Sequence, residues 1–168
     1  MRRVTRQEAD AAFVEFMTAA QPSLLRLAYF LTGSQDQARE LTQEALVRVY
    51  VKWPRIEQDA ALAYSRRVLV NLRIDRGRQA FREVASATLP DVAAASDRTV
   101  GEQDEMVTML RSLPERQRKI VVLRYCCDLS ERDVAEMLHI SVGGVKSQSS
   151  RGLAALRALP MATEGGRS

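Results

Sequence analysis

The sequence LSERDVAEMLHISVGGVKSQSSRGLAAL, residues 129–156, decides the fold that we expect for this chain of 168 residues. Ser130 and Ser141 are each placed to cap a short helix, because a serine hydroxyl accepts a hydrogen bond from an amide of the first turn. Asp133 stands in the answering position of a capping box. His139 lies in the turn between the two helices, where it tolerates a left-handed backbone better than most residues. Two short helices joined in this way form a helix-turn-helix, and its second helix suits the major groove of DNA.

The second predicted helix carries basic and hydroxyl side chains but no acidic residue. The helical period turns Lys146, Ser147, Ser150 and Arg151 outward, while Val145 points toward the first helix. A polar, cationic outer face of this kind favours contact with DNA.

The formal net charge of +4 is modest, but the charge is unevenly distributed. Between Arg66 and Arg82 the sequence holds six arginines and only one acidic residue, Asp75. A cationic helix is typical of a phosphate-binding surface. A solvated helix face with no partner is the alternative interpretation.

Cys126 and Cys127 are the only cysteines, and neighbours on a helix point in different directions, so no disulfide framework is expected. We expect one or both to be small core residues, in a protein of the reducing cytoplasm. The sequence has no apolar run approaching the ~20 residues that span a bilayer. Its basic start has no hydrophobic segment behind it, so no signal peptide and no membrane insertion are expected.

Helical periodicity along the chain predicts an all-α fold of two small helical domains joined by a flexible linker, with the helix-turn-helix in the second domain. The predicted domains span residues 1–83 and residues 102–160. The linker, residues 84–101, is rich in Ala, Ser, Thr and Asp and has no amphipathic stripe. Residues 161–168 are expected to form a tail.

Three helical segments are expected in the first domain. The first is interrupted near Pro22, where we expect the helix to kink or restart, and it ends at Gly33, with Ser34 capping the next helix. The second spans about residues 36–53 and the third about residues 61–82. The apolar stripe of the third helix is interpreted as Tyr64, Val68, Leu72 and Asp75, widened by Leu69 and Ile74.

Three motifs follow one another along the chain: LTGSQDQARELTQEALVRVYVKW at residues 31–53, AYSRRVLVNLRIDRGRQ at residues 63–79, and SLPERQRKIVVLRYCCDLSERDVAEMLHISVGGVKSQSSRGLAALR at residues 112–157. Their order, spacing and total length resemble the extracytoplasmic-function (group IV) σ factors of bacterial RNA polymerase, most closely the actinobacterial SigE-like branch. The resemblance covers most of the chain apart from the linker and the two termini. It implies that the first motif binds core polymerase, that the second lies beside the promoter's minus-ten element, and that the third reads the minus-thirty-five element.

The resemblance implies a polymerase-binding surface on the second helix, where polar residues stand beside an apolar anchor. A docking helix needs this mixture of desolvated and oriented polar contacts. A solvated helix face is the alternative. The residues implied are Glu40, Leu41, Gln43, Glu44 and Arg48, with Leu41 as the anchor.

At the minus-ten element, the resemblance implies that the loop at about residues 54–61 and the third helix take up an unpaired base. Asn71 offers both a donor and acceptors to a base edge, although it is also compatible with an ordinary surface position. The arginines would engage phosphates, and Asp75 would pair with an arginine rather than touch DNA. The residues implied are Arg66, Arg67, Asn71, Arg73 and Arg76.

At the minus-thirty-five element, the resemblance implies that Ser147, Ser150 and Arg151 lie nearest the base edges, with Lys146 and Gln148 near the DNA backbone. Arg151 has the geometry for a bidentate contact to guanine.

Two features depart from the family pattern. Family members often have an arginine where Gln148 stands and larger or charged residues where Ser149 and Ser150 stand, so the promoter sequence cannot be carried over. His139 occupies a turn position where glycine is common, and we expect it to have a structural role.

The partners implied by the resemblance are core RNA polymerase, through its clamp and flap regions, promoter DNA, and an anti-σ factor. No cofactor, metal ion or small-molecule substrate is expected. An enzyme is disfavoured because the sequence has one histidine, no cluster at metal-ligand spacing, no Gly-rich phosphate loop and no nucleophile elbow. Two other classes stay open: a DNA-binding regulator, which would bind duplex DNA alone as a symmetric dimer, and a protein-interaction module.

Overall fold

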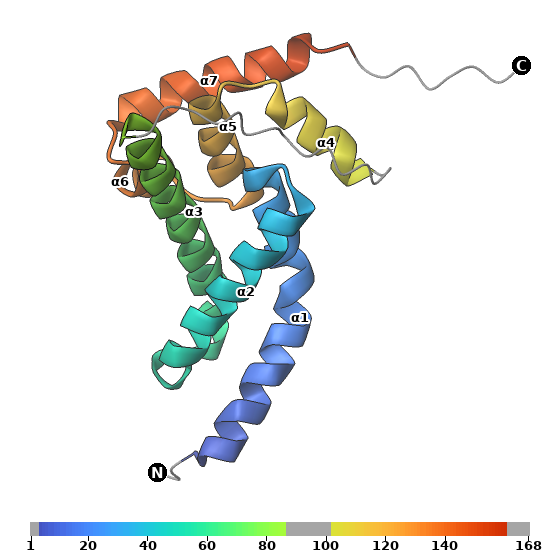
Figure 1. Cartoon of the computed structure of the whole chain (residues 1–168), viewed down its shortest axis with the longest axis vertical. Helices are drawn as coiled ribbons and strands as arrows, with labels where there is room; N and C mark the ends of the chain where they lie inside the picture. The colour runs from blue at the N-terminus through green and yellow to red at the C-terminus, as the bar shows by residue number, and fades with distance from the viewer. Residues whose placement is uncertain (1–3, 87–101, 161–168) are drawn as a thin grey trace, which may run out of the picture. The chain divides into compact units, whose positions relative to one another are not determined.

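The computed structural model describes residues 4–86 and 102–160, and the chain forms two compact units, residues 1–100 (unit 1) and residues 101–168 (unit 2) (Figure 1). The described residues of both units lie in helices and short connections, with no strand among them, which confirms the predicted all-α fold. The predicted tail and most of the predicted linker lie outside the described residues.

Unit 1 consists of three long helices, α1 (Arg6–Thr32), α2 (Gln35–Lys52) and α3 (Ala61–Ser86). Helices α1 and α2 pack along each other, and α3 packs against both. Two short 3-10 turns, η1 (Trp53–Arg55) and η2 (Gln58–Ala60), connect α2 to α3. Helix α3 continues through Ser86, so the linker cannot begin at residue 84 as predicted.

The helix ends of unit 1 follow from local sequence. Gly33 adopts a left-handed backbone with φ 68°, which glycine reaches without strain, and its N–H donates to the Tyr29 carbonyl at 2.8 Å. Ser34 caps α2 by accepting a hydrogen bond from the Gln37 amide. Both predicted caps are therefore confirmed. The expected restart at Pro22 is wrong, because α1 runs through this residue; proline removes the donor for the Thr18 carbonyl, and Thr18 is exposed to water.

The core of unit 1 is aliphatic at one end and aromatic at the other. Leu24, Leu41 and Leu69 are fully buried where the three helices meet. The Phe13 ring lies 5.2 Å from the Trp53 ring, centroid to centroid, in an edge-on arrangement. Since Trp53 is only 8% exposed, this contact anchors the start of the α2–α3 connection to α1.

The predicted stripe of α3 is only partly right. Leu69, Leu72 and Ile74 are buried, but Tyr64 and Val68 are half-buried and Asp75 is exposed. Small residues, Ala61 and Ser65, complete the buried side instead. Apolar residues occur on several sides of this helix, so the helical period alone did not fix which side faces α1 and α2.

Unit 2 contains α4 (Glu102–Arg111), α5 (Glu115–Val121), a π-helical turn η3 (Val122–Cys126), α6 (Glu131–Leu138) and α7 (Val142–Ala158). Helix α7 packs against α5 and α6. The α6–turn–α7 segment is the predicted helix-turn-helix, and α7 continues to Ala158, two residues beyond the predicted segment 129–156.

The two serine caps of the helix-turn-helix are also confirmed, although Asp133 accepts from the Ser130 hydroxyl and not from the backbone amide that a capping box would use. The Ser130 hydroxyl accepts from the Asp133 amide at 3.0 Å and donates to the Asp133 carboxylate at 2.8 Å. The Ser141 hydroxyl accepts from the Gly144 amide at 2.9 Å. His139 ends α6 with φ 54° and ψ 47°, a left-handed backbone, so it has the structural role expected of it.

Candidate nucleic-acid and partner interfaces

Helix α7 separates buried residues from an exposed polar row. Lys146, Ser147, Ser150 and Arg151 are exposed, as the sequence predicted, whereas Val145 is completely buried. Gln148 is half-buried at the edge of the row. We call Lys146, Ser147, Ser150 and Arg151 the α7 row.

Close packing on α5 fixes the orientation of the α7 row. A Cβ atom built on Gly152 would lie 2.7 Å from Val121 Cγ2, so only glycine allows the two helices to approach this closely. Ser149 faces the same interior and is 6% exposed, which explains why it contributes nothing to the outer face. Its Oγ has no hydrogen-bond partner among the described residues.

A small charge network lies at the start of α6, beside the α7 row. Glu131 has one carboxylate oxygen 3.8 Å from Lys146 Nζ and the other 3.9 Å from Arg124 Nη2. Lys146 is 64% exposed, and such an ion pair contributes little stability in water. Lys146 therefore keeps its charge at the surface without being fixed in place.

The arginines of α3 lie on two different sides of the helix. Arg67, Asn71, Arg78 and Arg82 are exposed and follow one another at spacings of four, seven and four residues, so all four share one side of α3. We call these four residues the α3 row. Arg78 and Arg82 were not among the predicted site residues; their exposure and their spacing from Asn71 are the signal that identifies them.

Two other arginines of α3, Arg73 and Arg76, make contacts inside unit 1. Arg66, Arg73 and Arg76 are half-buried, on a side of α3 different from the α3 row. The Arg73 side chain donates to the Leu31 carbonyl at 3.5 Å, and the Arg76 guanidinium donates to the Glu44 carboxylate. Asp75 is exposed and forms no ion pair with any residue that the structure describes.

The predicted minus-ten loop is a compact connection rather than a free loop. Trp53 anchors its start in the aromatic end of the core. A hollow of about 690 Å³ borders the connection, with Pro54, Ile56 and Gln58 among its lining residues.

Helix α2 presents a polar outer side that contains two apolar side chains. Glu40, Gln43 and Arg48 are exposed and Glu44 is half-buried, as a docking surface requires. Leu41 is fully buried against the other helices, so its prediction as the docking anchor is wrong.

The exposed aliphatic residues of α2 are valines instead, and Tyr50 is also partly exposed beside the groove between α1 and α2. Val47 is 59% exposed and Val51 is 69% exposed, and they lie one helical turn apart among the polar residues. We call Glu40, Gln43, Val47, Arg48 and Val51 the α2 surface. The sequence interpretation missed the two valines because apolar residues on an amphipathic helix are normally assigned to the core.

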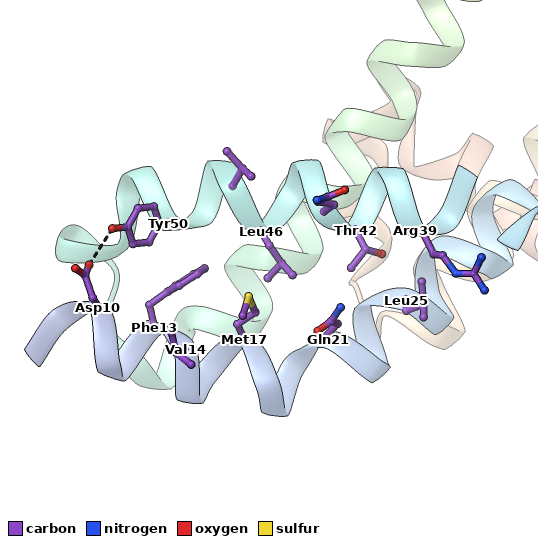
Figure 2. A pocket seen from close by; sticks show the side chains of 12 residues that line it. Asp10, Phe13, Val14, Met17, Gln21, Leu25, Arg39, Thr42, Leu46 and Tyr50 are labelled. Atoms are coloured by element: carbon purple, nitrogen blue, oxygen red, sulfur yellow. Dashed lines mark hydrogen bonds between the residues drawn. The ribbon is translucent and has the colours of Figure 1, made fainter. Parts of the chain in front are cut away.

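A groove of about 870 Å³ lies between α1 and α2, next to the α2 surface (Figure 2). Phe13, Met17 and Leu46 line it from the two helices, and Val47 belongs to both the groove and the α2 surface. At one end the Tyr50 hydroxyl donates to the Asp10 carboxylate at 2.9 Å. Thr42 also lines the groove, and among the described residues its buried Oγ1 has no hydrogen-bond partner. The groove is a mainly apolar hollow in which a partner side chain would meet few polar groups.

The half-buried carboxylate of Glu44 lies between two guanidinium groups. One oxygen accepts from Arg48 on α2 at 3.0 Å, and the other accepts from Arg76 on α3. The hydrogen bond from Arg76 lowers the pKa of Glu44 below its ordinary value, and Arg48 acts in the same direction. Glu44 is therefore ionised at neutral pH, and its bridge links α2 to α3.

Other kinds of site have little support in the described residues. Within residues 4–86 and 102–160, no three His, Cys, Asp or Glu side chains are grouped so that they would hold a metal ion. None of the described helices has the length and apolar character needed to cross a membrane. Cys127 is buried and Cys126 is exposed, so one of the two cysteines is the core residue that was expected.

Comparison with known proteins identifies both units. Residues 16–83 match Sigma-70 region 2, and residues 103–156 match Sigma-70, region 4. An RNA polymerase sigma-E factor of Streptomyces avermitilis is 39% identical over 149 residues, with 86% of this chain and 83% of the relative covered. The ECF RNA polymerase sigma factor SigW of Bacillus subtilis is 27% identical over 177 residues, with 94% of this chain and 92% of the relative covered.

A solved structure agrees with these relatives. The sigma factor RpoE, in complex with the anti-sigma factor NepR from Bartonella quintana, aligns with a TM-score of 0.63 at 25% identity, covering 87% of this chain and 94% of that chain. The chain therefore belongs to the extracytoplasmic-function σ factors, which bind core RNA polymerase and direct promoter-specific initiation through the minus-ten and minus-thirty-five elements.

Proposed function

We propose that three separate surfaces divide the work of this σ factor. In this proposal the α2 surface and the adjoining groove bind core polymerase, the α3 row binds the minus-ten element, and the α7 row reads the minus-thirty-five element. Unit 1 thus acts as the anchor and the melting domain, and unit 2 as the reader of duplex DNA. The chain itself carries out no bond chemistry, and it acts where polymerase and promoter meet, in the cytoplasm.

The observation that carries the proposal is the exposed pair Val47 and Val51. Leaving two valines in water on a polar helix costs free energy that a partner recovers when it covers them, about 1.5–3 kcal/mol for each fully buried side chain. Glu40, Gln43 and Arg48 surround the pair with groups that orient the partner. This is the arrangement of an interface core with a polar rim.

The two DNA-binding rows differ in the kind of contact they offer. The α3 row offers three guanidinium groups for phosphates and one amide, from Asn71, for the edge of an unpaired base. The α7 row offers hydroxyls and Arg151, a combination suited to base edges in the major groove. The hollow beside the α2–α3 connection is the candidate pocket for a flipped base.

An anti-σ factor is the further partner in this proposal. The aligned RpoE structure is a complex with an anti-sigma factor, which supports the same kind of partner here. The α2 surface is apolar at its centre and would suit such a partner. An inhibitor that covers it would exclude polymerase, because the two proteins would compete for the same residues.

The test compares Val47→Glu with a matched control, Val142→Glu. Val47 belongs to the α2 surface, whereas Val142 is an exposed valine of unit 2, at the start of α7 and outside the α7 row. Burying a carboxylate in place of an apolar group should weaken binding to core polymerase about tenfold or more. Val142→Glu should bind polymerase like the unsubstituted chain. Equal losses for the two variants, or no loss for Val47→Glu, would refute the docking assignment.

A further inference from the structure

Glu44 differs from its neighbours on α2 because both of its carboxylate oxygens are already occupied. Oε1 accepts from Arg48 Nη2 at 3.0 Å, and Oε2 accepts from Arg76 Nη2. The Glu44 side chain is 37% exposed, so water reaches it only in part. A direct contact with polymerase would have to displace one of these guanidinium groups or share an oxygen with it.

Arg76 lies on a different side of α3 from the arginines of the α3 row. It follows Arg67 by about two and a half helical turns, which places the two residues on opposite sides of α3. Its guanidinium is directed toward α2, where it meets Glu44 across 32 residues of sequence. Its position therefore relates it to the α2 surface and not to the DNA-binding row.

The cluster of Arg48, Glu44 and Arg76 has a net positive charge at the edge of the α2 surface, because two cations share one ionised carboxylate. The side chain of Arg48 is 57% exposed and remains accessible while Glu44 holds its Nη2. A charge-assisted bond of this kind restricts the long arginine side chain and orients its remaining donors.

We propose that Glu44 is a positioning residue and not a polymerase contact: it presents Arg48 on the α2 surface and joins α2 to α3 through Arg76. Arg76 then belongs to polymerase docking and not to the phosphate contacts of the minus-ten element. The proposal rests on the proposed function, because it assumes that polymerase docks on the α2 surface. It goes further because Glu44 is no longer a direct polymerase contact and Arg76 is no longer a phosphate contact. Instead, Glu44 positions Arg48, and Arg76 holds Glu44.

A double-mutant cycle in the full-length chain tests the role of Glu44. The variants are Glu44→Gln, Arg76→Gln and the two together, and the measurement is equilibrium affinity for core polymerase. Each single variant should lower affinity about two- to fivefold, the range of a partly exposed ion pair. The double variant should bind no more weakly than Glu44→Gln alone, because Arg76→Gln breaks only a bridge that Glu44→Gln has already broken. Effects that multiply in the double variant would overturn the proposal.

Glu40→Gln is the matched control for this cycle. It removes the same charge from the same exposed side of α2, but none of the ion pairs described in the structure includes Glu40. Its effect on polymerase affinity should multiply with that of Arg76→Gln, as expected for independent sites. Coupling between Glu40 and Arg76 as strong as that between Glu44 and Arg76 would show a general charge effect and would count against a specific bridge.

The salt dependence of DNA binding tests the role of Arg76 by a readout that helix stability does not move. For a single-stranded minus-ten oligonucleotide, each lost phosphate contact lowers the slope of log affinity against log salt by about 0.7. Arg67→Gln should lower the slope by that amount, whereas Arg76→Gln should leave it unchanged. An equal fall for Arg76→Gln would overturn the reassignment.

The failures of the two proposals are distinguishable. If Val47→Glu has no effect on polymerase affinity, the docking surface itself is wrong. If Val47→Glu weakens binding as expected while Glu44→Gln and Arg76→Gln act independently, the docking surface stands and only the positioning role of Glu44 fails.

Discussion

Replacing Gly152 by alanine should destabilise unit 2, although alanine is the better helix former. The new Cβ would lie 2.7 Å from Val121 Cγ2 and 3.7 Å from Gln117 Cβ, whereas carbon atoms in contact prefer about 3.5–4.0 Å. Val121 is 4% exposed and β-branched, so it has little freedom to move aside. Overpacking of this kind costs about 1–3 kcal/mol, and the gain in helix propensity returns about 1 kcal/mol. We therefore expect a net loss of about 1 kcal/mol in the free energy of unfolding.

Gly143→Ala is the control for this change, because it lies in the same helix but in open space. The nearest atom to its Cβ would be Ser141 Oγ at 4.0 Å, so the substitution should be neutral or stabilise the protein by up to about 1 kcal/mol. Urea unfolding followed by circular dichroism measures both variants. Val121→Ala alone should also destabilise the protein, but the double variant Gly152→Ala with Val121→Ala should lose less free energy of unfolding than the sum of the two single losses, because the smaller side chain removes the clash. A Gly152→Ala protein as stable as Gly143→Ala would refute the close-contact argument.

Three further predictions concern Ser149, Phe13 and Glu44, which are buried or half-buried. Ser149→Ala should raise the free energy of unfolding by up to about 1 kcal/mol, because it removes a buried hydroxyl without a partner among the described residues; a loss of stability in urea unfolding would contradict this. Phe13→Ala should cost about 3–5 kcal/mol and shift the fluorescence of Trp53 to the red, since the two rings are in contact; unchanged emission would show that the indole does not depend on Phe13. The lowered pKa of Glu44 means that its stabilising effect is present at neutral pH and is lost as pH falls below the ordinary value of 4.5. The stability difference between the unsubstituted chain and Glu44→Gln should therefore narrow in acid, and a constant difference in urea unfolding would count against the bridge.

Local features of this fold were predictable from the sequence because their causes are local. Gly33, Ser34, Ser130 and Ser141 act within one helical turn of their own positions, and each was assigned correctly. His139 belongs to the same class, since its left-handed backbone depends on the turn that it occupies. The resemblance to a family supplied the roles of the two units, which local chemistry alone would not have given.

Features that depend on packing between helices were predicted less well. The helical period of α2 puts Leu41 on one stripe with Ala38, Ala45 and Val49, and all four are buried. The docking role of Leu41 came from the family resemblance, which did not show that this side chain packs against the other helices. The bridge between Glu44 and Arg76 joins residues far apart in the sequence, and nothing near either residue signals its partner. The two sides of α3 also became distinct only when the packing of unit 1 was known.

Run-off transcription titrated with the chain tests the division of labour between the α2 surface and the α7 row most directly. Val47→Glu protein should transcribe poorly at low concentration, but once it saturates core polymerase it should restore full transcription from the same promoters. Arg151→Ala protein should bind polymerase normally yet keep its loss of promoter selectivity at every concentration. The account would be contradicted if a higher concentration restored normal, promoter-selective transcription with both variants. It would also be contradicted if Val47→Glu protein, at a concentration that saturates core polymerase, transcribed from different promoters.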